Sequence, residues 1–171
     1  SSVGTLINGT ETVASGSFPE TSSTGHTVTL TGVTQTTGSG GKFGEGYTFG
    51  SYASNHYMAM PDHADFNFAG GSFTIEFWIK FTATPSNYAT IFGQGSQTAE
   101  HALVLGDWGG TTDEHNLEWI AEGGLGSDMN MRGSSGSNQT GPLNVLNTWY
   151  HIAVVRNSDL WSIYINGNFR K

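Results

Sequence analysis

The chain has 171 residues, which suits one domain with a buried core, and its lack of cysteine excludes disulfide bonds and thiolate metal sites. The formal net charge is −8, with only six Lys and Arg in total, so no basic surface is available for the phosphates of a nucleic acid. Only 12% of the residues are charged, Gly is abundant at 25, and no apolar run approaches the roughly 20 residues that span a bilayer. This composition predicts a turn-rich protein with few ionic groups on its surface and without membrane insertion.

Residues 1–66 predict short strands separated by turns. Residues 27–33 alternate hydroxyl and apolar side chains, as a strand with one solvated face does. In residues 42–50 aromatic side chains lie among glycines, a pattern typical of a strand that another backbone approaches closely. The other segments are an opening strand and turn in residues 3–12, a loop in 15–23, a flexible connection in 38–41, a short strand in 57–60 and a turn or single helical turn in 62–66.

The clearest strand pattern lies in residues 73–81, where large apolar and mostly polar side chains alternate without a break. Because side chains of a strand point to opposite faces in turn, one face is wholly apolar and the pattern predicts a central strand that packs on a core through that side. The second face carries Thr74, Glu76, Trp78 and Lys80. There Trp78, between an acid and a base, could cover a neighbouring loop or contact a ligand.

The second half of the chain continues with strands and no sustained helical period. Strands are predicted in residues 89–93, 101–105, 117–121, around Met129 and Met131, and in 150–156 and 160–165. Asn166-Gly167 then indicates a hairpin, because both central positions of a type I′ turn need a positive φ. About ten short strands at this spacing predict an all-β protein, an antiparallel β-sandwich or jelly roll.

Several motifs follow one another in the order found in a known family. They are Lys42-Phe43-Gly44, Tyr57-Met58-Ala59-Met60-Pro61-Asp62, Asp65-Phe66-Asn67-Phe68, Ser72-Phe73-Thr74-Ile75-Glu76-Phe77-Trp78, Asn147-Thr148-Trp149-Tyr150-His151-Ile152-Ala153-Val154-Val155-Arg156 and Tyr164-Ile165-Asn166-Gly167. On these motifs the chain resembles the concanavalin A-like, laminin G-like jelly-roll family, most of all its versions in bacteriophage and bacterial surface proteins. The resemblance implies two curved antiparallel sheets, a frequent carbohydrate-binding role and, in some members, a calcium ion at the rim.

The resemblance also sets an expectation for the domain and its partners. We expect one laminin G-like domain over residues 1–171, incomplete at its C-terminal side, because family members continue with further strands after the hairpin and only residues 168–171 follow it here. A sheet edge left open in this way pairs readily with another chain. Neighbouring protein subunits along that edge are therefore expected partners.

The family's glycanase relatives carry two glutamates flanking an aspartate on one strand, and this chain has no such strand. Retaining hydrolysis needs two carboxyl groups roughly 5 Å apart. Glu76 stands alone on its strand, while Glu118 and Glu122 are four residues apart with no aspartate between them. A cross-strand pair of one of these with Glu76 stays open, although structural or solvated acids are the commoner explanation. We expect no enzymatic activity.

Candidate binding residues concentrate in the loop of residues 106–116. Hard oxygen ligands from Asp107 and Asp113 could hold calcium, although their spacing matches no known calcium motif. Trp108 lies in this polar loop among glycines, where no strand period requires it, so it is the best candidate for an exposed platform on which a sugar ring stacks. His115 accompanies them. Trp78 and Glu76 are the next candidates, and Trp119, Trp149 and Trp161 are expected in the core.

His63 and His151 could join a site, although a lone histidine beside a strand is more often only hydrogen-bonded. Together the residues predict a non-enzymatic carbohydrate-binding or adhesion module on a virion or cell surface, extracellular, with a glycan or glycoprotein as its partner. The alternative is a structural virion or adhesin subunit that acts in assembly without binding sugar. A glycoside hydrolase is a third hypothesis, which the placement of the acids disfavours.

Overall fold

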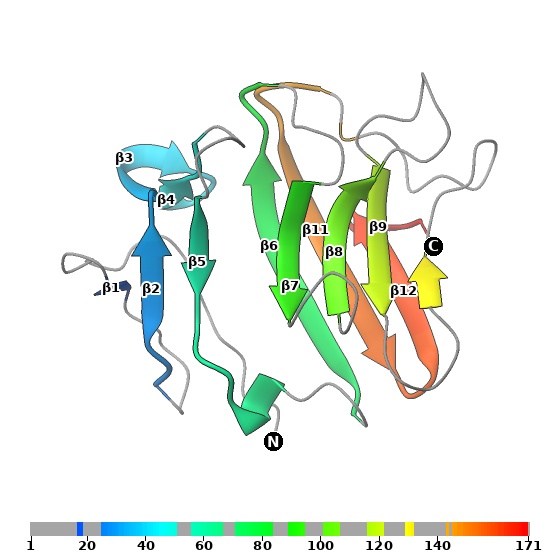
Figure 1. The fold of residues 1–171 in the computed structure, drawn as a ribbon. Helices are drawn as coiled ribbons and strands as arrows, with labels where there is room; N and C mark the ends of the chain where they lie inside the picture. Colours follow the sequence, from blue (N-terminus) through cyan, green and yellow to red (C-terminus); the bar gives the residue numbers. More distant parts are fainter. Residues whose placement is uncertain are drawn as a thin grey trace. The chain divides into compact units, whose positions relative to one another are not determined.

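The computed structural model describes residues 17–18, 25–50, 56–66, 71–83, 89–94, 101–106, 116–121, 129–131, 143 and 145–170. These residues form thirteen strands and one short 3-10 helix (Figure 1). They divide into two compact units, Ser1–Gly70 and Gly71–Lys171, which are taken separately below. The single domain over residues 1–171 stays a prediction, and the opening strand expected in residues 3–12 lies outside the described residues. No helix in the described part of the chain has the length and apolarity needed to cross a membrane.

The N-terminal unit contains a three-stranded antiparallel sheet and a two-stranded hairpin. The sheet has the order β1 (Ser17–Phe18), β2 (Val28–Thr31) and β5 (Tyr57–Ala59), and the hairpin joins β3 (Thr34–Gly41) to β4 (Gly44–Thr48). The 3-10 helix η2 (Ala64–Phe66) follows β5 and confirms the expected helical turn. The strand β1 corrects the loop assigned to residues 15–23, because two residues of that segment pair with β2.

The hairpin of β3 and β4 corrects the flexible connection expected in residues 38–41. These residues belong to β3, whose register shifts between Thr36 and Gly41. The backbone N–H of Gly46 donates to the Thr36 hydroxyl at 2.9 Å, and a Cβ on Gly46 would lie 2.9 Å from the Gly41 Cα. Glycine is therefore needed for the close approach of the two strands, as the glycine-aromatic pattern predicted. Because glycine has no side chain, this part of the sequence also lacks the alternation of apolar and polar residues that identifies a strand.

The C-terminal unit consists of two four-stranded antiparallel sheets, which Figure 1 shows as two layers. The first sheet has the order β10 (Met129–Met131), β9 (Asn116–Ala121), β8 (His101–Gly106) and β7 (Ala89–Gln94). The second has the order β13 (Asn168–Phe169), β12 (Leu160–Ile165), β11 (Trp149–Asn157) and β6 (Phe73–Lys80). This is the antiparallel β-sandwich that the strand pattern predicted.

The strand β6 alternates between half-buried and exposed residues as its sequence predicts. It pairs antiparallel with β11, Phe77 opposite Ile152 and Glu76 opposite Ala153. Among the residues described, β6 pairs with β11, and the expectation that β6 is a central strand stays a prediction. The alternation itself gave no information on the number of neighbours, because it reports which face is buried and not how many strands flank it.

The core lies between the two layers of the C-terminal unit. It contains Trp119 and Leu117 from β9 together with Ile152, Val154 and Ile163 from the opposite sheet, all of them buried. The apolar side of β6 packs against this cluster, although its side chains are half-buried and not fully enclosed. Each large apolar side chain removed from water in this way contributes about 1.5–3 kcal/mol to folding.

The expected hairpin after β12 is confirmed by its backbone. Asn166 and Gly167 have φ values of 52° and 75°, as a type I′ turn requires. The Asn166 N–H donates to the His151 carbonyl at 2.8 Å, and the His151 N–H donates to Asn166 Oδ1 at 2.9 Å. The turn therefore fixes the start of β11 as well as the end of β12.

Candidate functional site

The side of the β6–β11–β12–β13 sheet that points away from the core, called the outer face below, carries several aromatic and charged side chains. In an antiparallel pair, residues directly opposite each other share one face. The outer face of β6 therefore presents Glu76, Trp78 and Lys80, and β11 presents Ala153, His151 and Trp149 opposite them. The indole of Trp78 lies in the middle of this group and keeps 37% of its surface exposed.

Trp78, Glu76 and His151 form one contact group. The rings of Trp78 and His151 have their centroids 5.1 Å apart with 47° between their planes. His151 Nε2 lies 3.4 Å from Glu76 Oε2, and the two side chains are 26% and 63% exposed. The imidazole therefore lies against both the aromatic ring and the carboxylate, and the carboxylate keeps most of its surface for solvent or a ligand.

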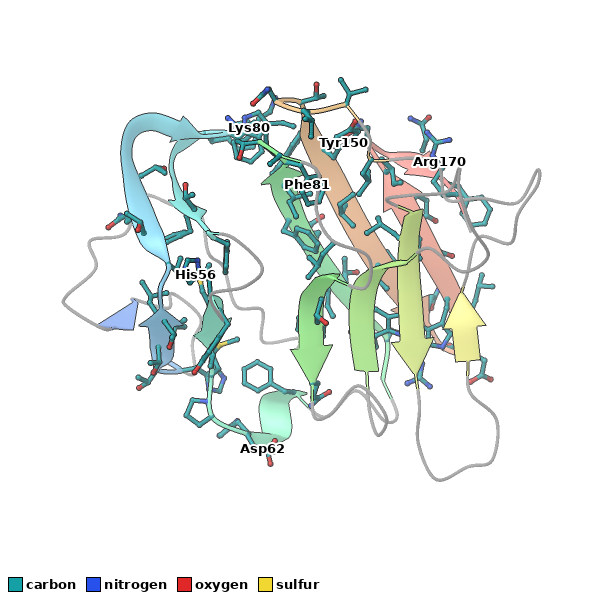
Figure 2. The ribbon with its side chains drawn as sticks, turned by 45° about the horizontal axis from the view of Figure 1, so that its top comes forward. His56, Asp62, Lys80, Phe81, Tyr150 and Arg170 are labelled. Carbon is teal, nitrogen blue, oxygen red and sulfur yellow. The ribbon has the colours of Figure 1, made fainter. Side chains whose placement is uncertain are left out.

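Lys80 and Trp149 form a second contact next to the first. The Lys80 ammonium lies 4.9 Å from the centroid of the Trp149 ring, a cation–π geometry. Figure 2 shows Lys80 at the end of β6 beside Tyr150, which begins β11 with Trp149. The placement of Trp149 on the outer face overturns the prediction that it is a core residue. Trp119 is fully buried and Trp161 packs against the core, as predicted.

The outer face continues over β12 and β13 with apolar side chains. Tyr164 is opposite both Ala153 and Phe169, and its ring centroid lies 5.8 Å from that of Phe169. Phe169 and Leu160 are 64% and 68% exposed. The outer face thus has a polar, charged part on β6 and β11 and an apolar part on β12 and β13.

The residues predicted for the site fall into two groups. Trp78 and Glu76 are placed together on the outer face, two residues apart on the same side of β6. Asp107, Trp108, Asp113 and His115 lie outside the described residues, so the loop site and its calcium ligands stay predictions. Lys80 lies on the same side of β6, and the pairing of β6 with β11 adds His151 and Trp149.

The described residues provide no cluster of side chains that could hold a metal ion. No group of three or more His, Asp or Glu side chains is close enough to hold an ion in the described part of the chain. Glu118 belongs to β9 in one sheet and Glu76 to β6 in the other, so these two residues are not cross-strand partners, whereas Glu122 lies outside the described residues. Glu76 is directly opposite Ala153, whose side chain has no carboxyl group.

These features define an antiparallel β-sandwich with an exposed aromatic and charged outer face. The chain belongs to the laminin G-like group of the concanavalin A-like lectin/glucanases superfamily, whose model matches residues 51–171. No curated protein and no solved structure matches the chain. This membership supports a lectin-like or binding module in general terms.

Proposed function

We propose that this protein is a non-enzymatic carbohydrate-binding or adhesion module on a virion or cell surface, and that it binds a glycan or glycoprotein through the outer face. The observation that carries the proposal is the exposed indole of Trp78 beside the contact between Glu76 and His151. Burial of this large apolar ring would release about 25 cal/mol for each Å² removed from water, so its exposure suits a surface that is covered by a ligand.

The groups around Trp78 match the chemistry of a sugar ring. The C–H face of a pyranose stacks on an indole, and its hydroxyl groups donate to a carboxylate such as Glu76. A hydrogen bond to a charged partner contributes about 1.5–3 kcal/mol when water is excluded. His151 can donate or accept next to both residues. A site with one aromatic platform and a few polar groups of this kind is typical of small-ligand recognition.

The test is a glycan array probed with the wild-type chain and with Trp78→Ala, followed by titration calorimetry on the glycans retained. We expect binding by the wild type and a loss of about tenfold or more in Trp78→Ala. The matched control is Thr74→Ala, which changes an exposed residue on the same face of β6 and is expected to bind normally. Absence of wild-type binding to any glycan would reject the proposal.

The calcium expected at Asp107 and Asp113 enters the same experiment as a separate condition. The array is repeated with EDTA and with added calcium. Binding that disappears with EDTA and returns with calcium supports a rim site that includes Asp107, Trp108, Asp113 and His115. Binding that is insensitive to EDTA but sensitive to Trp78→Ala assigns recognition to the outer face alone.

A second candidate function is assembly, in which the chain is a structural virion or adhesin subunit. The observation that favours it is the exposed apolar pair Leu160 and Phe169 on β12 and β13, since large exposed apolar side chains often mark protein contacts. Multi-angle light scattering of the wild type and of Phe169→Ser tests it. An oligomer that Phe169→Ser dissociates supports assembly, and a wild-type monomer at all concentrations contradicts it.

A further inference from the structure

Glu76 and Lys80, which flank Trp78 on β6, carry opposite charges. A ligand that lies along the strand therefore meets different groups at its two ends. Glu76 precedes Trp78 by two residues and Lys80 follows it by two, so each lies about 7 Å from Trp78 along the strand on the outer face. The carboxylate only accepts hydrogen bonds, and the ammonium only donates them. A sugar stacked on Trp78 therefore finds an acceptor at one end and a donor at the other.

The donor end also has an apolar wall. Lys80 Nζ lies over the ring of Trp149 at 4.9 Å, which keeps the ammonium beside an aromatic surface. A group that fits this place needs an acceptor oxygen for Lys80 and a small apolar portion for Trp149. A ring hydroxyl supplies the oxygen without the apolar portion, whereas the acetamido group supplies a carbonyl oxygen and a methyl group together.

The negative net charge of the chain disfavours an acidic glycan beside Lys80. A carboxylate would pair with Lys80, but the chain carries a formal net charge of −8, and Glu76 is 63% exposed on the same face. Negative charges on the protein raise the free energy of a bound anion, most strongly at low ionic strength. A neutral acceptor avoids this repulsion.

We propose that the group of Glu76, Trp78, Lys80, Trp149 and His151 recognises a neutral glycan that contains an N-acetylated amino sugar. The sugar ring stacks on Trp78, its hydroxyls donate to Glu76, and its acetamido carbonyl accepts from Lys80 with the methyl group against Trp149. This inference rests on the proposed carbohydrate binding and deepens it, because it names the substituent that the site selects.

The test compares three trisaccharides of the same linkage by titration calorimetry: N-acetylglucosamine, glucose and glucuronate oligomers. The wild type is expected to bind the N-acetylated oligomer about tenfold more tightly than the glucose oligomer, since one hydrogen bond to a charged donor is at stake. Glucuronate is expected to bind most weakly. Lys80→Met keeps the length and apolar contact of the side chain but removes its charge, and it is expected to abolish the preference for the N-acetylated oligomer.

The outcomes separate this inference from the proposed function. Equal wild-type affinities for the N-acetylated and glucose oligomers, or an equal loss for both in Lys80→Met, overturn the acetamido assignment and leave carbohydrate binding intact. Tighter binding of glucuronate overturns it in favour of an anion site at Lys80. Loss of binding to both oligomers in Trp78→Ala, with an unchanged circular dichroism spectrum, supports the platform. No binding of any of the three oligomers overturns the acetamido assignment, whereas carbohydrate binding itself is rejected only by the glycan array.

Discussion

Trp78 of β6 and His151 of β11 are directly opposite each other on the outer face, with their ring centroids 5.1 Å apart. Their contact depends on the register of the two strands. A slip of one residue would turn every side chain of one strand to the other face, so His151 would enter the core and Ile152 would face solvent. The burial of Ile152 and Val154 therefore holds the imidazole beside the indole and the Glu76 carboxylate.

The contact of Glu76 with His151 is expected to add little to stability. Both side chains keep contact with water, and pairs of this kind contribute about 0.2–1 kcal/mol in double-mutant cycles. We therefore expect a coupling free energy below about 1 kcal/mol from urea unfolding of Glu76→Gln, His151→Gln and the double variant. A coupling of several kcal/mol would show that the pair is a structural element of the sheet, which would weaken its assignment to a ligand.

Removal of a core side chain from β11 is expected to destabilise the C-terminal unit strongly. Ile152 is fully buried among Leu117, Trp119 and Ile163, and Ile152→Ala leaves a cavity that costs about 2–5 kcal/mol in the free energy of unfolding. Thr74→Ala, on the exposed side of the neighbouring strand, is expected to change it by less than about 0.5 kcal/mol. Urea unfolding of both variants measures the difference, and similar values for the two would contradict the assignment of the faces.

Trp119 and Trp149, which were both predicted to be core residues, are expected to contribute differently to stability. Trp119 is fully buried and stacks near Phe92, with ring centroids 6.1 Å apart, whereas Trp149 lies on the outer face under Lys80. Trp119→Ala is expected to cost about 3–5 kcal/mol, and Trp149→Ala about 1 kcal/mol from the lost cation–π contact and partial burial.

Thermal unfolding followed by circular dichroism compares these two tryptophan variants. If Trp119→Ala does not fold, Trp119→Phe replaces it, and the expected order of stability is unchanged. A larger loss in Trp149→Ala than in either Trp119 variant would place Trp149 in the core after all.

The parts of the fold that were predictable are those in which a local pattern carries the physical cause. The alternation in residues 73–80 requires one side that faces solvent and one that faces the core. Asn166-Gly167 can adopt the two positive φ values of a tight hairpin. The same reasoning fails where side chains are absent. Residues 38–41 show no alternation, yet they belong to β3, in which Gly41 pairs with Gly44 of β4.

The candidate site was only half predictable, because its residues come from strands distant in sequence. Glu76 and Trp78 share a strand face, so their neighbourhood follows from the period of two. His151 and Trp149 join them through the pairing of β11 with β6, which depends on tertiary packing. Trp149 illustrates the limit, since an aromatic residue at the end of an apolar strand suits either face until its cross-strand partner, Lys80, is known.

Gly167, in the hairpin between β12 and β13, is a position where backbone conformation affects stability in the absence of steric contacts. Gly167 has φ of 75°, and a Cβ placed on it would meet no atom within 4 Å. Gly167→Ala is therefore expected to lower the free energy of unfolding by about 1–2 kcal/mol through the left-handed conformation alone. The matched control is Gly71→Ala, where a Cβ is equally free of contacts but φ lies outside the left-handed region. That variant is expected to be neutral or to stabilise by up to about 1 kcal/mol, because alanine restricts the unfolded chain.

Urea unfolding of the two glycine variants measures this difference, and amide exchange at His151 locates it. The His151 N–H donates to Asn166 Oδ1, so a distorted turn in Gly167→Ala exposes this amide and raises its exchange rate, whereas Gly71→Ala leaves the rate unchanged. Since His151 contacts Trp78 and Glu76, loosening of the turn is also expected to weaken glycan binding at the outer face. Equal stability and equal exchange in the two variants would mean that the turn does not constrain His151.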